Sequence, residues 1–140
     1  MDLPYLDAPG GRRLVYLPEP WIEPFLLTVL EGREYPALPF RSFAPAVIFD
    51  IGAHIGAAAL YFANQYPRAR IHCFEPNPTT LAVLRRNAAA VERITVHGHG
   101  LGAQARTAEL YSGVHSTMQA SFLPNQENTR QVATVPIKDA

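Results

Sequence analysis

The stretch that decides the fold is Ala46-Val47-Ile48-Phe49-Asp50-Ile51-Gly52-Ala53-His54-Ile55-Gly56. It opens with an apolar run that ends at Asp50, and such a run predicts a strand buried on both faces of a parallel sheet. Gly52 and Gly56 then allow a tight turn, and the nearly all-apolar residues 57–66 predict a helix that Pro67 ends. A strand, a glycine turn and a helix in this order are the opening unit of an α/β fold.

The same pattern continues on the carboxyl side of this stretch. Residues 70–74 predict a second strand, and residues 93–97 predict a third. Between them, Asn77 followed by Pro78 predicts the start of a helix, because asparagine caps helix N-termini and proline suits the first helical position. Three parallel strands joined by two right-handed crossovers form the first half of a doubly wound α/β sheet. Further strands are predicted over 106–111 and 131–137.

Two regions of unequal character are predicted. Residues 1–45 are expected to form an N-terminal cap that is helical and rich in proline, and residues 46–140 a partial cofactor-binding domain. Within the cap, the spacing of apolar residues predicts a short strand over 13–17 and a helix over 20–30. The prolines that follow indicate a linker or lid over 34–45.

Composition excludes several classes of protein. The 140 residues include 12 basic and 12 acidic ones, so the chain lacks the basic excess typical of nucleic-acid-binding modules. No apolar run reaches the roughly 20 residues needed to span a bilayer, and the N-terminus lacks the pattern of a signal peptide. Cys73 is the single cysteine, so a disulfide within the chain is impossible. The sequence therefore predicts a cytoplasmic protein with no nucleic-acid and no membrane partner.

The glycine turn suits a particular kind of ligand. Ligands of open α/β sheets bind at the carboxyl ends of the strands, where a helix N-terminus attracts a negative group. The dinucleotide fingerprint Gly-x-Gly-x-x-Gly requires glycine where this chain has His54, and the Gly-Lys-Ser/Thr of a phosphate loop is absent. The turn therefore favours a nucleoside whose charged end is an amino acid, such as S-adenosylmethionine. The alternative is a structural turn that binds nothing.

Glu75, at the end of the second predicted strand, supplies the second part of this pattern. A carboxylate at this position can accept hydrogen bonds from both hydroxyls of a ribose, as the acidic residue of nucleotide-binding α/β folds does. The alternative is a structural acidic residue that the dipole of the following helix stabilises.

Three segments of the sequence resemble the FkbM-type S-adenosylmethionine-dependent methyltransferases. They are residues 47–56, 74–78 and 84–87, which read VIFDIGAHIG, FEPNP and LRRN. The resemblance runs from about residue 31 to the C-terminus, and the first two motifs in this order are specific. It implies an α/β, Rossmann-like class I methyltransferase fold. Only the first half of that fold, strands 1–3 with their helices, is expected here, behind a proline-rich N-terminal extension.

The resemblance also implies where the cofactor S-adenosylmethionine would lie. Asp50 and the glycine turn would face its methionine end, Glu75 its ribose, and the segment from Gly98 to Leu101 its adenine. The implied cofactor-binding residues are Asp50, Gly52, Ala53, His54, Gly56, Glu75, Pro76, Gly98 and Leu101. No catalytic residue can be assigned, because the family's next strand, with its Lys-x-Asp-x-Glu-Gly-type sequence, has no counterpart here.

The implied function is methyl transfer from S-adenosylmethionine to a small-molecule acceptor, expected to be a hydroxyl of a sugar or natural product. The alternative is a non-catalytic half-domain that acts as a binding or assembly module. Without a fourth strand, residues 46–50 would form an apolar edge, which we expect either to self-associate or to be covered by residues 131–137. We also expect no methyl transfer by these 140 residues alone.

The remaining chemistry-bearing residues are given structural roles. His97 and His99 could form half of a metal site, but no further ligand lies at suitable spacing and no metal is predicted. Cys73 is expected to be an inert core residue. Trp21, Phe25 and Leu26 are expected to pack against the sheet, with a lid over the cofactor as the alternative. The polar connection that could border the acceptor contains His115, Ser116 and Ser121.

Overall fold

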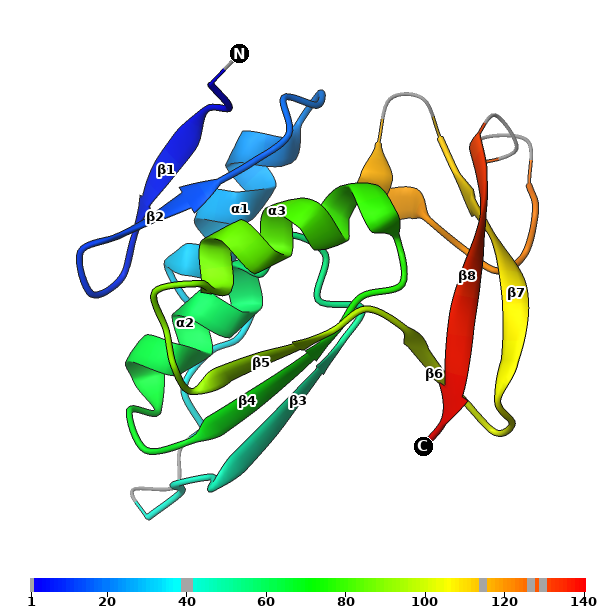
Figure 1. Ribbon diagram of the computed structural model, residues 1–140. Coiled ribbons are helices and arrows are strands. Elements are labelled where there is room, and N and C mark those ends of the chain that lie inside the picture. The colour runs from blue at the N-terminus through cyan, green and yellow to red at the C-terminus, as the bar shows by residue number, and fades with distance from the viewer. Residues whose placement is uncertain (1, 39–41, 114–115, 126–127, 129–130) are drawn as a thin grey trace.

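Three parallel strands, β3 (Val47–Ile51), β4 (Arg70–Phe74) and β5 (Ile94–His97), form the central sheet of the protein (Figure 1). The structure is a computed structural model that describes residues 2–38, 42–113, 116–125, 128 and 131–140. Helices α2 (Ala57–Gln65) and α3 (Pro78–Ala88) connect successive strands, so the predicted α/β fold is confirmed. Each predicted strand of this sheet agrees with the observed one to within one residue at either end.

Local sequence explains where the two connecting helices begin. Asn77 caps α3, because its side-chain oxygen accepts a hydrogen bond from the Thr79 N–H at 3.0 Å, and Pro78 occupies the first helical position. Helix α2 begins after Gly56, whose φ of +90° is one that L side chains rarely adopt. A Cβ added at Gly56 would lie 2.7 Å from Leu84 Cδ1, so glycine also allows α2 and α3 to approach.

The N-terminal segment forms a hairpin and a helix that join the same core. Strand β2 (Arg12–Val15) pairs with β1 (Tyr5–Ala8), which the sequence did not indicate, and α1 (Ile22–Leu30) follows. Leu14 and Leu26 are fully buried in one hydrophobic cluster with Leu60 and Leu84 of α2 and α3. The segment predicted to be a cap therefore packs directly on the helices of the central unit.

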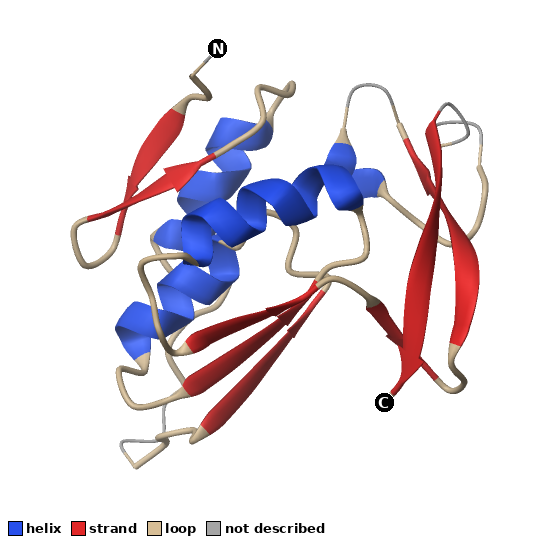
Figure 2. Cartoon of the chain, in the orientation of Figure 1, coloured by secondary structure: helices blue, strands red, loops and turns tan. Residues whose placement is uncertain are grey.

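The expectation that β3 is buried on both faces is wrong. Figure 2 shows α1, α2 and α3 on one side only of the β3-β4-β5 sheet. On the opposite side, Phe49 and Ile51 are 65% and 66% exposed. Among the residues that the structure describes, β3 pairs with β4 alone. The apolar run was correctly identified as a strand, but nothing described covers its outer face.

The C-terminal part of the chain forms a separate sheet in the order β6-β8-β7. Its strands are β6 (Gly100–Gly102), β7 (Arg106–Ser112) and β8 (Gln131–Asp139), and the short 3₁₀ helix η1 (Thr117–Gln119) lies between β7 and β8. Strand β8 runs antiparallel to β7 and parallel to β6. The expectation that residues 131–137 cover the edge of β3 is therefore wrong, because these residues pair with β7, and Ile137 also with β6, rather than with β3.

Candidate functional site

A pocket of about 460 Å³ opens where β3 and β4 end, which is the position expected for a ligand of an α/β sheet. Its volume lies in the range of small-molecule sites. The glycine turn, the end of β4, helix α1 and the connection that contains η1 all contribute to it. The lining residues on which the function depends are Phe25, Tyr35, Asp50, Gly52, Ala53, His54, Glu75, Pro76, Leu101, Thr117, Met118, Ser121 and Phe122.

The backbone of the glycine turn is fixed to the end of β4. The N–H groups of Gly52 and Ala53 both donate to the Phe74 carbonyl, at 2.9 and 3.1 Å. Gly52 has a φ of +79°, although a Cβ there would meet no atom within 4 Å. Glycine is thus needed at this position for its backbone conformation rather than for space.

Glu75 ties the turn to the start of helix α3. One oxygen of its carboxylate accepts from the His54 N–H at 2.7 Å, and the other accepts from the Asn77 N–H at 2.8 Å. Burial raises the pKa of Glu75, and these two backbone N–H groups act in the opposite direction. The predicted ribose ligand and the structural alternative are therefore compatible, since a carboxylate offers about four acceptor positions.

Asp50 carries the clearest sign of a missing partner. Its Oδ2 atom is buried and makes no hydrogen bond to any described residue. Burial, and to a lesser extent the nearby Glu75 carboxylate, raises the pKa of Asp50 to about 6. Buried carboxylate oxygens are normally hydrogen-bonded, so a donor brought by a ligand would relieve this cost.

The ring of His54 connects the turn to η1. Its Nε2 lies 2.6 Å from the Thr117 hydroxyl, and the Thr117 N–H donates to the Glu19 carboxylate at 2.9 Å. Burial lowers the pKa of His54 to about 4, so the ring is neutral near pH 7. The backbone of His54 has a φ of 51°, a conformation that histidine tolerates better than most residues. Three segments far apart in the sequence thus meet at one side of the pocket.

Most of the predicted cofactor-binding residues come together, and two do not. Asp50, Gly52, Ala53, His54, Glu75, Pro76 and Leu101 line the pocket. Gly56 lies behind the turn against Leu84. Gly98 faces helix α3, because a Cβ there would lie 2.9 Å from Leu81 Cδ2, and Gly100, two positions later, lines the pocket instead.

The other candidates have mixed outcomes. Phe25 and Leu26 line the pocket, whereas Trp21 is 86% exposed and packs against nothing that would make it a core residue. Cys73 is fully buried, and burial raises the pKa of its thiol to about 12. Ser121 lines the pocket, and His115 lies outside the described residues.

The two histidines after β5 lie beside an aromatic side chain. His97 stacks on Phe74 with ring centroids 4.5 Å apart, and His99 Nδ1 lies 3.0 Å from the Gly100 carbonyl oxygen. Within the described part of the chain, no group of three or more His, Cys, Asp or Glu residues is arranged to hold a metal ion. In the same part of the chain, no helix combines the length and apolar character that crossing a bilayer would require.

Asn87 is a positioning residue that the sequence analysis did not single out, although it closes the quoted LRRN segment. Its side-chain oxygen accepts from the Val15 N–H at 2.9 Å, and its amide donates to the carbonyls of Val15 and Ile55 at 2.8 Å each. The side chain is buried, and it joins β2, α3 and the glycine turn. Its role depends on contacts between distant segments, which no local pattern reveals.

Comparison with known proteins found relatives that are methyltransferases. No family model matches the sequence. Methyltransferase sdnD of Sordaria araneosa is 34% identical over 84 residues, which are 58% of this chain and 32% of that protein. The 31-O-demethyl-FK506 methyltransferase FkbM of Streptomyces tacrolimicus is 45% identical over 42 residues, which are 30% of this chain and 16% of that protein. A crystal structure of methyltransferase FkbM from Methylobacillus flagellatus KT is 21% identical with a TM-score of 0.43, covering 72% of this chain and 24% of that one.

Over its matched segments, the chain is related in sequence to FkbM-type methyltransferases. This agrees with the resemblance carried by the glycine turn and the FEPNP motif. The chain spans less than two thirds of the length of either curated relative. The structural similarity is too low to add to the relationship, which rests on the sequence matches.

Proposed function

We propose that this chain carries the S-adenosylmethionine-binding part of a methyltransferase with a Rossmann-like fold, and that the pocket at the ends of β3 and β4 is the cofactor site. The observation that carries the proposal is the unpartnered Oδ2 of Asp50 beside the glycine turn. A buried carboxylate of this kind suits the ammonium group at the methionine end of the cofactor, which brings both a positive charge and hydrogen-bond donors.

Each residue of the site would contact a different part of the cofactor. Asp50 would bind the ammonium group, and the turn over 52–56 would face the methionine carboxylate with the N-terminus of α2. Glu75 would accept from the ribose hydroxyls with the acceptor positions that remain beside the His54 and Asn77 N–H groups and the Thr80 hydroxyl. Pro76 and Leu101 offer apolar contacts to the adenine. When bound, S-adenosylmethionine supplies an electrophilic methyl group on a sulfonium.

The acceptor is proposed to be a hydroxyl of a sugar or natural product. The support is the name of the Streptomyces relative, a 31-O-demethyl-FK506 methyltransferase. This chain contributes positioning of the cofactor in a pocket of limited volume, which lowers the entropic cost of bringing two reactants together. No general base is assigned.

Calorimetry with S-adenosylhomocysteine and with NAD tests the cofactor site. We expect S-adenosylhomocysteine to bind and NAD to bind far more weakly. Asp50→Asn and Glu75→Gln keep the shape of the site, and each should weaken binding by about 1–3 kcal/mol, which is the usual cost of losing a charged hydrogen-bond partner. Glu109→Gln, at the exposed Glu109, is the matched control. No binding of S-adenosylhomocysteine, or equal affinity in all three variants, would contradict the proposal.

A second candidate function is a non-catalytic binding or assembly module that pairs with another copy of itself. The observation that favours it is that β3 pairs with β4 alone among the described residues, so its other edge is unpaired, and its side chains at Val47, Phe49 and Ile51 are exposed. Apolar strand edges of this kind recruit further strands. Sedimentation velocity should then show self-association that Val47→Lys abolishes. A monomer at all concentrations that binds S-adenosylhomocysteine would exclude this alternative.

A further inference from the structure

Four large apolar side chains that are only partly buried gather at the mouth of the pocket. Phe25, Tyr35, Met118 and Phe122 are 38–42% exposed, and all four line the pocket. We call these four residues the apolar rim. Exposed apolar residues are normally scattered, and several of them lining one pocket mark a candidate binding surface.

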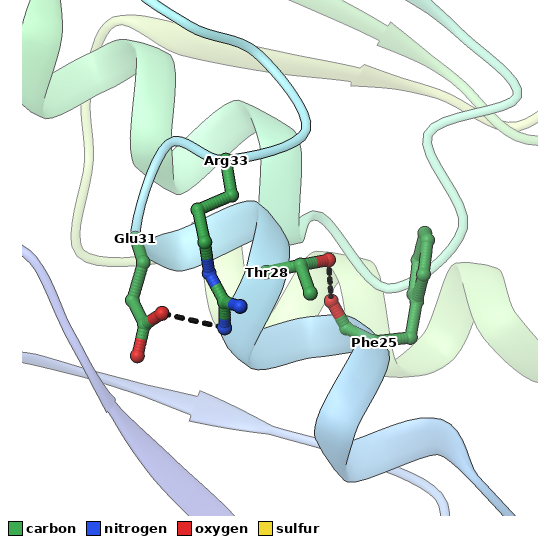
Figure 3. A network of polar contacts seen from close by, with 4 residues as sticks. All are labelled: Phe25, Thr28, Glu31 and Arg33. Atoms are coloured by element: carbon green, nitrogen blue, oxygen red, sulfur yellow. Dashed lines mark hydrogen bonds and ion pairs between the residues drawn. The ribbon is translucent and has the colours of Figure 1, made fainter.

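The rim is built from segments whose positions are fixed by hydrogen bonds. Figure 3 shows the ring of Phe25 projecting from α1 on the side away from Glu31 and Arg33. Within this helix, the Thr28 hydroxyl donates to the Phe25 carbonyl at 2.7 Å.

The residues beyond α1 are held in a similar way. The Tyr61 hydroxyl donates to the Tyr35 carbonyl at 2.9 Å, and the Tyr35 ring lies 5.2 Å from that of Phe62. In the connection between β7 and β8, the contacts of Thr117 with His54 and Glu19 hold the segment that carries Met118. The rim is therefore largely formed before a ligand arrives.

The charged residues that line the pocket restrict the charge of a ligand that could bind at the rim. Asp50 and Glu75 are the only Asp or Glu among the described lining residues, and none of those residues is Lys or Arg. Nothing in the lining would compensate a phosphate or carboxylate on a second ligand, and the two carboxylates would repel it. Aromatic rings and a flexible methionine instead favour stacking and apolar contact with a ring system.

We infer that the apolar rim is an acceptor subsite for an uncharged or cationic molecule that carries an apolar ring system, and that Phe25 and Met118 determine this preference. The inference rests on the proposed function, because it assigns the rim to the second substrate of the same pocket. Within the broad class of sugars and natural products, it favours apolar ring-bearing compounds and excludes phosphorylated sugars.

Three probes test this subsite in the full chain, with S-adenosylhomocysteine present at saturation and again absent. They are 2-naphthol, 2-naphthyl phosphate, which has the same ring and a negative charge, and glucose. Titrations followed by amide NMR should show binding of 2-naphthol, at least tenfold weaker binding of the phosphate, and no saturable binding of glucose. Equal affinity for 2-naphthol and its phosphate would overturn the inference.

Substitutions then locate the site. Phe25→Ala and Met118→Ala should each weaken 2-naphthol binding by about three- to tenfold, because each removes apolar contact area. Met118→Lys should also reduce the difference in affinity between 2-naphthol and 2-naphthyl phosphate, since the lysine adds a positive charge that would attract the phosphate. The matched control is Trp21→Ala, which removes an exposed aromatic ring that does not line the pocket.

The outcomes separate the two proposals. Naphthol binding that survives the rim substitutions but is lost in Phe49→Ser would place the probe on the outer face of the sheet and overturn the inference. If the parent protein does not bind S-adenosylhomocysteine, the proposed function is contradicted instead. Circular dichroism and thermal unfolding of each variant show that a loss of binding is not a loss of fold.

Discussion

The two faces of the β3-β4-β5 sheet come from the same strands and have opposite environments. On the inner face, Ile71 and Cys73 have no exposed surface, because the helices pack on them. On the outer face, Phe49 and its neighbours on β3 are mostly exposed. On β3, the residues of this outer face, Val47, Phe49 and Ile51, are apolar although they are exposed. The comparison teaches that apolar character identifies a strand, whereas burial depends on which other elements pack against each face.

The largest expected effect is on the inner face. Ile71→Ala should destabilise the protein by about 2–5 kcal/mol, because it leaves a cavity in a fully packed region. Urea unfolding followed by circular dichroism measures the change in free energy of unfolding. A loss below 1 kcal/mol would show that the inner face is loosely packed, and the contrast between the faces would disappear.

The next largest effect is expected where Asn87 of helix α3 joins the N-terminal hairpin to the glycine turn. Asn87→Ala removes three hydrogen bonds and leaves groups of Val15 and Ile55 without their partner. We expect a loss on the order of 3 kcal/mol in the free energy of unfolding. Asn64→Ala, at an exposed position of α2, is the control and should change stability by less than about 0.5 kcal/mol. Similar values for the two variants would remove Asn87 from the set of positioning residues.

A third effect lies at the carboxyl end of the inner face and depends on pH. Burial raises the pKa of Asp50 from 3.8 to about 6, so the folded protein binds more protons than the unfolded chain between these values. The contribution of Asp50 to stability therefore falls as the pH rises through this window. For His54, whose pKa is lowered to about 4, stability instead falls as the pH drops from 6.5 to 4. The two slopes oppose each other in the parent protein.

Asp50→Asn should remove the Asp50 contribution to the pH dependence of stability and leave that of His54. At pH 7 the variant should be more stable than the parent by on the order of 2–3 kcal/mol, because no buried negative charge remains. Below pH 6.5 its stability should decline more steeply than that of the parent, since the His54 contribution is no longer opposed. Urea titrations from pH 4 to 8 measure both effects, with Asp7→Asn at an exposed carboxylate as the control. An unchanged pH profile would show that Asp50 is not buried in solution.

The smallest expected effect is on the outer face. Phe49→Ala removes a side chain that is 65% exposed, and it should lower the free energy of unfolding by less than about 1 kcal/mol. The residual loss comes from its ring contacts with His72 and Phe74, at 5.6 and 6.0 Å. A loss as large as that of Ile71→Ala would mean that another copy or segment covers this face in solution.

The sequence predicted the central unit because its signals are local. The Asn77-Pro78 pair starts a helix by itself, and the glycines of the turn require no distant partner. These signals also placed Asp50 and Glu75 at one end of the sheet. Their spacing could not show that Glu75 already accepts two backbone N–H groups, because side-chain contacts depend on the folded turn.

What the sequence could not predict depends on long-range contacts. Apolar residues 131–137 have the same pattern whichever strand they pair with, so their pairing with β6 and β7 could not be read from them. The apolar rim combines Phe25, Tyr35 and Met118 from separate segments, none of which carries a motif. Trp21 was predicted to pack because of its position on a helical pattern, yet the helix begins one residue later and leaves it exposed.

The three hydrogen bonds of Asn87 have a consequence for the order in which the protein forms during synthesis. Val15 and Asn87 are 72 positions apart, so the hairpin cannot complete this contact until helix α3 has been translated. At typical rates of translation, the apolar side of the hairpin remains without its partner for several seconds after it leaves the ribosome. Closing so long a loop also adds to the entropic barrier of folding. The N-terminal hairpin is therefore expected to complete its packing late, only once helix α3 has formed.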